Sequence, residues 1–202
     1  MTEMRETIVL DRQSMGPALY RDAMSRYAGH VQLVTTALGS ERRGVTITAA
    51  CSVSDNPATV LICLNNSNVK NEIFFKSGVF ALNALGAHHQ GLADAFSGKT
   101  GLTNDERFAA GTFETLVTGA PVLADALAAF DCRVTEIKEA STHNIIFGEV
   151  MAVRFSEIKP PIAPDIGNRD RRVDHHRPAI RPHRNSRAND FLAKIGCKKR
   201  QR

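Results

Sequence analysis

Two consecutive apolar segments joined by a turn signal constrain the fold of this chain more than any other feature. Residues 44–52 begin with an alternation of apolar and hydroxyl-bearing side chains, as in a strand with one buried face. Residues 59–64 are almost wholly apolar and rich in β-branched side chains, which is typical of a strand buried on both faces. Between them stands Ser54-Asp55-Asn56-Pro57, and an Asn-Pro pair is a strong turn signal. The stretch therefore predicts a β-hairpin.

Similar short segments recur on both sides of this hairpin. Further strands are expected at residues 31–37, 79–85, 128–138 and 144–155, and helices at 17–27, 68–77, 88–96 and 103–108. Residues 38–43 are expected to form a turn and residues 112–127 a loop. Ser67 is placed to cap the helix that follows it, and Thr103 with Glu106 has the spacing of a capping box. About six short strands with inserted helices favour a mainly β fold, an antiparallel closed barrel, over a parallel doubly wound sheet.

The charge of the chain is unevenly distributed. The formal net charge is +5, but residues 163–202 hold twelve basic and four acidic side chains, whereas residues 1–162 hold fourteen and seventeen. Prolines and arginines crowd together beyond Pro160. We therefore expect one domain over residues 1–161 and a basic Arg/Pro/His-rich tail over 162–202. Binding of nucleic acid would depend on that tail alone and is not expected of the domain.

Neither a membrane segment nor a secretion signal is expected. No apolar run is long enough to span a bilayer. The first twelve residues carry Glu3, Glu6 and Asp11 and have no apolar core. The four cysteines, at positions 51, 63, 132 and 197, lack the C-x-x-C spacing, and they predict reduced thiols in a cytoplasmic protein.

Hydroxyl and amide side chains gather at the ends of the predicted hairpin strands. Thr46, Thr48 and Ser52 could donate hydrogen bonds to a ring system, although threonine is also an ordinary strand residue. Asn65-Asn66-Ser67 precedes a predicted helix, and such a terminus can either bind phosphate through free N–H groups or simply be capped. The combination suits a flat, polar-edged cofactor with a phosphate tail.

Histidines and one lysine are the other candidates for chemistry. His143 stands just before an apolar strand, where it could order a substrate or hold a proton, or merely belong to a turn. His88 and His89 would point about 100° apart on a helix, so no metal site is expected of them. Ser97-Gly98-Lys99-Thr100 ends like a phosphate-binding loop but lacks its first glycine and its leading strand, so nucleotide hydrolysis is not expected.

Several motifs together resemble the short-chain flavin reductase family. They are Tyr20-Arg-Asp-Ala-Met-Ser-Arg-Tyr, the run from Gly44 to Pro57, Leu61-Ile-Cys-Leu-Asn-Asn-Ser, Phe80-Ala-Leu-Asn-Ala-Leu, Ala95-Phe-Ser-Gly, Glu106-Arg-Phe, Ala120-Pro-Val-Leu and Thr142-His-Asn-Ile-Ile-Phe-Gly-Glu-Val. The resemblance covers about residues 18–156 in the right order. The family includes the reductase component of 4-hydroxyphenylacetate 3-monooxygenase and the corrin reductase of cobalamin biosynthesis.

This resemblance implies a six-stranded split β-barrel of the FMN-binding type. It also implies a homodimer with FMN or FAD at its interface and NADH or NADPH as the hydride donor. The matching positions would place Thr46, Ile47, Thr48, Ala49, Ser52 and Val53 at the flavin ring, Asn65, Asn66, Ser67 and Asn71 at its phosphate, Phe96, Ser97 and Lys99 where the site closes, and His143 beside the nicotinamide.

The expected function is hydride transfer from NADH to a flavin, with the reduced flavin passing to a monooxygenase. Because the cofactor carries that chemistry, the protein needs no strong acid or base. Two alternatives stay open: flavin-dependent reduction of a corrinoid, cob(II)yrinic acid diamide, and a flavin-binding module without turnover.

Overall fold

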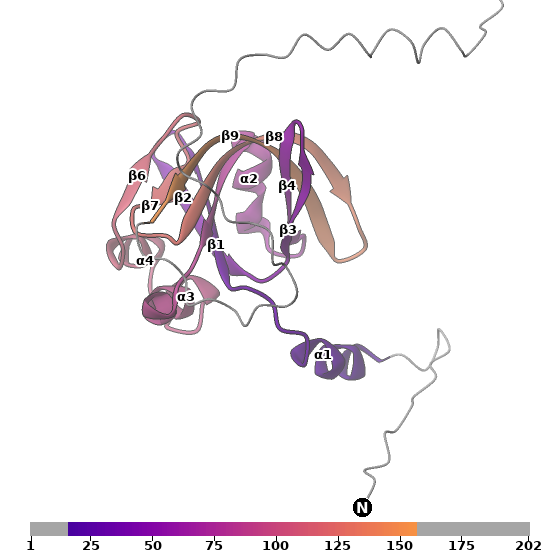
Figure 1. The fold of residues 1–202 in the computed structure, drawn as a ribbon. Coiled ribbons are helices and arrows are strands. Elements are labelled where there is room, and N and C mark those ends of the chain that lie inside the picture. The colour runs from indigo at the N-terminus through magenta and orange to yellow at the C-terminus, as the bar shows by residue number, and fades with distance from the viewer. Residues whose placement is uncertain (1–15, 157–202) are drawn as a thin grey trace, which may run out of the picture. The chain divides into compact units, whose positions relative to one another are not determined.

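The computed structural model describes residues 16–156 (Figure 1). Its helices are α1 (Pro17–Ser25), α2 (Glu72–Ser77), α3 (Gln90–Ser97) and α4 (Asn104–Ala109), with single 3₁₀ turns η1 (Val69–Asn71) and η2 (Ala87–His89). Its strands are β1 (Gln32–Leu38), β2 (Glu41–Ile47), β3 (Ala50–Asp55), β4 (Ala58–Asn65), β5 (Val79–Ala84), β6 (Phe113–Thr115), β7 (Pro121–Leu123), β8 (Ala128–Glu139) and β9 (His143–Phe155). The predicted tail at 162–202 lies outside the described residues, and its boundary stays a prediction.

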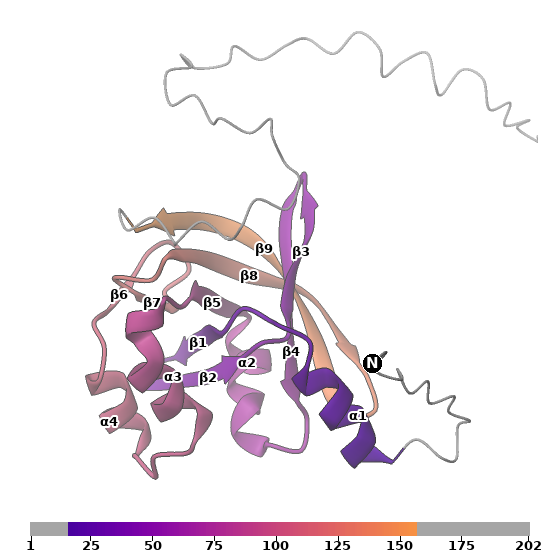
Figure 2. The same cartoon turned by 60° about the horizontal axis from the view of Figure 1, so that its bottom comes forward.

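Seven of these strands form one antiparallel sheet. Their order is β2-β1-β5-β8-β9-β4-β3, so the consecutive strands β2 and β3 lie at opposite edges. Only Thr48 and Ala49 connect those two edges, which requires the sheet to curl strongly, as Figures 1 and 2 show. The edges do not pair with each other, so the expectation of a closed six-stranded barrel is not confirmed: the sheet has seven strands and stays open.

The curled sheet buries side chains on both of its faces. On the inner face, Ile73 and Phe74 of α2 pack against Val34, Phe80 and Ile146 of three strands. On the other face, α3, α4 and the short β6–β7 pair contribute to a second cluster: Leu33, Ala81, Leu85, Leu92, Ala93, Phe96, Phe108, Ala120, Val122, Leu123, Ala126 and Ala129. Strand β1 supplies neighbouring residues to opposite clusters, as a two-residue side-chain period requires.

The predicted hairpin is present, with two differences. Strands β3 and β4 pair from Ala50–Ile62 to Asp55–Ala58 around a cis Asn56–Pro57 bond. The first predicted strand, however, is interrupted at Thr48-Ala49, because β2 pairs with β1 while β3 pairs with β4. The second strand is also not buried on both faces: Val60, Ile62 and Leu64 are buried, whereas the residues between them are partly exposed.

Local signals gave most of the remaining elements correctly. Thr103 and Glu106 form the predicted capping box of α4, and α2 ends at Gly78 in the left-handed region, with φ 67°. The turn expected at residues 38–43 is far shorter, since Leu38 already pairs with Glu41. Asn68 rather than Ser67 caps the helical segment, because the Asn68 side chain accepts the hydrogen bond from the Lys70 amide. The predicted loop at 112–127 contains the paired strands β6 and β7.

No helix among the described residues is long and apolar enough to cross a membrane.

Candidate functional site

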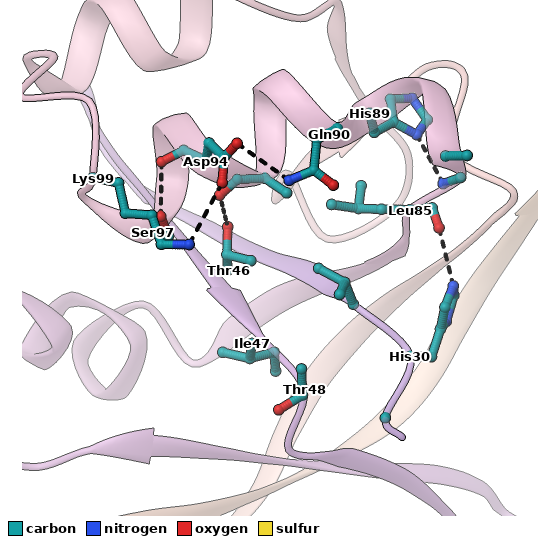
Figure 3. Close-up of a pocket in the computed structure, with 15 residues that line it drawn as sticks. His30, Thr46, Ile47, Thr48, Leu85, His89, Gln90, Asp94, Ser97 and Lys99 are labelled. Atoms are coloured by element: carbon teal, nitrogen blue, oxygen red, sulfur yellow. Dashed lines mark hydrogen bonds and ion pairs between the residues drawn. The ribbon is translucent and has the colours of Figure 1, made fainter. Parts of the chain in front are cut away.

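A cavity of about 550 Å³ opens between the edge strand β2 and helix α3 (Figure 3). Thr46, Ile47 and Thr48 line it from the end of β2. Four other segments form the opposite wall and the rims. They are Gly29 to Val31 before β1, Leu85 to Ala87, the helical residues His89, Gln90, Ala93 and Asp94, and Ser97 with Lys99. The volume lies within the range of typical small-molecule sites, roughly 300–1,000 Å³.

Two contacts fix the width of this cavity. The Thr46 hydroxyl donates a hydrogen bond of 2.8 Å to the carbonyl oxygen of Ala93, which ties β2 to α3 (Figure 3). Two residues earlier on the same face of β2, Gly44 leaves room for the Phe96 ring: a Cβ at Gly44 would lie 2.4 Å from the Phe96 Cε1 atom. The helix therefore approaches the strand closely at one end, and the cavity opens beyond Thr46.

The lining of the cavity combines apolar walls with a polar rim. Ile47, Leu85 and Ala93 are buried, whereas Thr48 is exposed and its hydroxyl has no partner among residues 16–156. The Lys99 ammonium lies 3.7 Å from an Asp94 carboxylate oxygen, and 77% of its side chain is exposed. Such an exposed pair is weak, so the ammonium is available to another anion. These residues fit a flat ring with polar edges.

A second group of predicted residues forms a corner at the end of β4. The Asn65 carboxamide oxygen accepts hydrogen bonds from the Ser67 amide (2.8 Å) and hydroxyl (2.7 Å), and Asn71 donates to the Asn65 carbonyl oxygen (3.0 Å). Asn66 donates from its backbone amide to Thr142 (3.2 Å). His143 is the partner of Asn65 in the β4–β9 ladder. The structure thus brings five predicted residues together, and we call them the Asn65 corner: Asn65, Asn66, Ser67, Asn71 and His143.

The other predicted residues divide between these places and elsewhere. The β2–α3 cavity contains Thr46, Ile47, Thr48, Ser97 and Lys99, but none of the corner residues lines it. Ser52 lines a separate cavity of about 270 Å³, and Val53 is exposed on β3. The carbonyl oxygen of Ala49 accepts a hydrogen bond from Cys63 (2.9 Å). Phe96 is only 3% exposed and packs edge-on against Phe108 and Phe113, so it supports the cavity from behind and does not line it.

A comparison with known protein families shows to which family the chain with this cavity belongs. The family model described as "Flavin reductase like domain" matches residues 24–172, well over half of the chain. The chain belongs to this family.

Individual relatives agree with that assignment. An FMN reductase (NADH), RutF, of Agrobacterium fabrum is 43% identical over 151 residues, which are 75% of this chain and 84% of the relative. The solved flavin reductase PheA2 is 33% identical with a TM-score of 0.65 and is matched over 71% of this chain and 90% of its own. The NADH:FAD oxidoreductase SgcE6 of Streptomyces globisporus, solved with NAD and FAD fragments, is 26% identical with a TM-score of 0.65, over 80% of this chain and all of its own.

Sequence reasoning missed several residues that line the cavity of this flavin reductase family member. The His30 ring bonds the carbonyl oxygen of Leu85 at 3.0 Å, and the Gly86 amide donates to Nδ1 of the buried His89 at 3.0 Å (Figure 3). These bonds hold the segment between β5 and α3 across the cavity. No local sequence pattern predicts these two hydrogen bonds. The first joins residues 55 positions apart in the chain, and the second depends on a turn of 3₁₀ helix.

The adjacent histidines are arranged differently from the expectation. The ring centroids of His88 and His89 in η2 lie only 3.8 Å apart, and one ligand atom from each and from Asp125 lie within 4.8 Å of one another. The Gly86 amide nevertheless makes Nδ1 of His89 an acceptor, so the ring proton is on Nε2, which lies 3.1 Å from Asp125 Oδ1. Nε2 is the ring atom that faces Asp125, and a metal bound there would require the ring proton to be on Nδ1, where it would oppose the Gly86 N–H.

Proposed function

We propose that this chain is an NADH-dependent flavin reductase that uses FMN or FAD. The observation that carries the proposal is the cavity between β2 and α3, with buried apolar walls and the hydroxyl of Thr48 and the ammonium of Lys99 at its rim. Supporting it, the relative at 43% identity is named an FMN reductase that uses NADH. When bound, the flavin would supply the hydride-accepting chemistry.

The residues of the chain would then act by positioning. Ile47 and Leu85 offer apolar surface to the faces of a ring, and Thr48 offers a hydroxyl to its polar edge. At a bound phosphate, Ser67 would exchange its two hydrogen bonds to Asn65 for contacts with the phosphate, and Asn65 would donate from its carboxamide. The buried Asn71 would help to hold this phosphate site through its bond to the Asn65 carbonyl oxygen, and His143 stands beside them for the nicotinamide. Holding two planar molecules in contact can account for a large share of the rate acceleration, so no strong acid or base is required.

The proposal includes a homodimer. The cavity and the Asn65 corner are separate surfaces of one chain, and a second copy could bring the corner of one subunit to the cavity of the other. Helix α1 supports this idea, because it buries none of its residues and leaves Tyr20 and Met24 exposed; Tyr27, just beyond its end, is exposed too. Light scattering during gel filtration should give twice the chain mass of 22.1 kDa; a monomer that still binds flavin tightly would contradict this part of the proposal.

The final electron acceptor is a further part of the proposal. Reduced flavin would leave the protein and reach a monooxygenase component, as the resemblance implies. Reduction of a corrinoid by bound flavin is the alternative. Anaerobic reduction with NADH followed by addition of cob(II)yrinic acid diamide or of a monooxygenase separates the two acceptors.

Steady-state oxidation of NADH tests the core of the proposal. We expect the purified chain to oxidise NADH only when FMN or FAD is added, at a rate that saturates with flavin. Tight flavin binding without NADH oxidation would instead identify a binding module. Absence of any flavin-dependent rate at micromolar protein would overturn the proposal.

A further inference from the structure

A groove of about 420 Å³ outside the β2–α3 cavity is lined by four positively charged side chains. Arg42 and Arg43 come from the start of β2, Lys70 from η1, and Arg107 from α4. We call these four residues the cationic groove. The start of β2 and α4 are in contact, because the Asn104 carboxamide donates a hydrogen bond of 2.8 Å to the Arg42 carbonyl oxygen. The rest of the lining is Ser40, Glu41, Leu102, Thr103, Asn104 and Asp105.

The four positive charges of the cationic groove are unpaired within the described part of the chain, and they outnumber the two carboxylates, Glu41 and Asp105, that also line it. None of its four members forms an ion pair there, although six ion pairs occur elsewhere in residues 16–156. Arg42 lies over the Phe108 ring at 4.5 Å, and Arg43 donates to the Asn71 carboxamide oxygen at 3.4 Å. Both contacts position the guanidinium groups without cancelling their charge.

Two of the arginines also have unused hydrogen-bond donors. The Nε atoms of Arg43 and Arg107 are buried and have no partner among residues 16–156. Burial, and then the like charge of Arg107, lower the pKa of Arg43. Leaving buried donors unpaired and like charges together costs free energy, which a bound anion would recover. Guanidinium groups suit phosphate oxygens in particular, because they can donate two parallel hydrogen bonds.

The position of the cationic groove relates it to the proposed flavin reductase site. Arg43 contacts Asn71 directly, and Lys70 precedes Asn71 in the chain, so the groove borders the Asn65 corner. Along β2, Arg42 is four residues from Thr46 of the cavity, a distance of about 13 Å at 3.3 Å per residue. The Gly44–Phe96 contact lies between them on β2, so the groove is separate from the cavity and adjoins the Asn65 corner.

We propose that the cationic groove binds the phosphate group of a nucleotide ligand, either the flavin or the nicotinamide dinucleotide. This inference rests on the proposed function for the identity of the ligand but not for the existence of the anion site.

Substitutions of two groove residues test the proposal. Arg107→Gln removes one charge with its unpaired donor, and Lys70→Gln removes an exposed charge whose loss should not affect folding. Arg133→Gln, on an exposed position of β8 outside the groove, is the matched control. For each protein, fluorescence titration gives the Kd for FMN and for riboflavin, which lacks the phosphate. Steady-state kinetics give the KM for NADH, and calorimetry gives the Kd for inorganic pyrophosphate.

We expect each groove variant to raise the Kd for pyrophosphate by about tenfold, the usual effect of losing one charge-assisted contact. If the flavin phosphate occupies the groove, the Kd for FMN rises similarly while that for riboflavin changes less than about twofold. If the nicotinamide dinucleotide occupies it, the KM for NADH rises and the Kd for FMN does not. Arg133→Gln should leave all four quantities unchanged.

Different experimental results would overturn the proposed anion site and the proposed flavin reductase function. Pyrophosphate binding that is weakened by the groove substitutions, in a protein that neither binds flavin nor oxidises NADH, would support the anion site and overturn the proposed function. An active reductase in which Arg107→Gln and Lys70→Gln change neither pyrophosphate binding, nor the FMN-to-riboflavin preference, nor the KM for NADH would overturn the groove alone.

Discussion

The Thr46 hydroxyl donates a 2.8 Å hydrogen bond to the Ala93 carbonyl oxygen, and this bond joins the edge strand β2 to helix α3 beside the cavity. Thr48, two residues along and just past the end of β2 at Ile47, has no such partner in the described chain. Two threonines that look equivalent in the sequence therefore have different roles: Thr46 holds the cavity wall, and Thr48 offers its hydroxyl to the cavity.

Substitution of each threonine by valine should separate these roles. We expect Thr46→Val to lower the free energy of unfolding by about 1 kcal/mol, the usual net value of one hydrogen bond. Thr48→Val should change it by less than about 0.5 kcal/mol, as is usual for exposed positions, and should instead raise the Kd for FMN by about fivefold. Urea unfolding and fluorescence titration measure the two effects. The assignment fails if Thr48→Val leaves FMN binding unchanged.

The close approach of Gly44 to Phe96 gives a second prediction. An added Cβ at Gly44 would lie 2.4 Å from the Phe96 Cε1 atom, and that ring is held by Phe108 and Phe113. Gly44→Ala should therefore destabilise the fold by about 1–3 kcal/mol, as overpacking usually does. Gly91→Ala is the control: nothing lies within 4 Å of its Cβ position on α3, and alanine favours a helix by up to about 1 kcal/mol. Thermal unfolding should show opposite shifts, and equal shifts would refute the packing argument.

His143 should affect the nicotinamide more than the flavin. Its ring bonds the Thr142 hydroxyl at 2.9 Å and is otherwise exposed beside Asn65. We expect His143→Ala to raise the KM for NADH by about tenfold while the Kd for FMN changes less than about twofold. His88→Ala, an exposed histidine outside the corner, is the control in the same kinetic assay. Equal losses of NADH use and FMN binding would rule out this role for His143.

Local chemistry made those features of the structure predictable that depend on neighbouring residues. The capping box at Thr103 and the turn at Asn56-Pro57 were found because each depends on residues within a few positions of one another. The interruption at Thr48-Ala49 could not be found in the same way. The alternation of side chains continues up to that point, and only the different partners of β2 and β3 divide the segment.

The candidate site shows the same limit. Thr46 and Thr48 are predicted from one continuous segment, but the opposite wall of the cavity comes from α3 and from His30 with Leu85, which no spacing rule connects to that segment. Phe96 stands beside Ser97 in the sequence, yet the helical period turns its ring into the aromatic cluster and away from the cavity. The cationic groove combines three segments and was not visible as a charge cluster in the sequence.

The cysteines should differ sharply in reactivity. Burial, assisted by the neighbouring Asp131 charge, raises the pKa of the Cys132 thiol to about 12, so at pH 8 only about one in 10⁴ molecules carries the thiolate there. Burial and the nearby Cys51 also raise the pKa of Cys63. Cys51 is exposed. Peptide mapping after brief treatment with iodoacetamide should find Cys51 modified and Cys132 intact, and both modified in denaturant. Fast modification of native Cys132 would contradict its burial.

The capping box of α4 should contribute to the pH dependence of stability. Hydrogen bonds from the Thr103 amide (2.8 Å) and hydroxyl (2.7 Å) to the Glu106 carboxylate lower the pKa of Glu106. Because the folded pKa lies below the unfolded one, the contribution is complete above the unfolded pKa and is lost as the pH falls through the folded pKa. Glu106→Gln should therefore unfold more easily than the wild type near pH 7, and this difference in the free energy of unfolding should shrink as the pH falls below about 4.5.

Glu136→Gln is the control in the same urea titrations, because Glu136 is exposed and forms no ion pair in the described chain. A Glu106→Gln difference that stays constant from pH 7 to pH 3 would show that the carboxylate charge does not strengthen the cap.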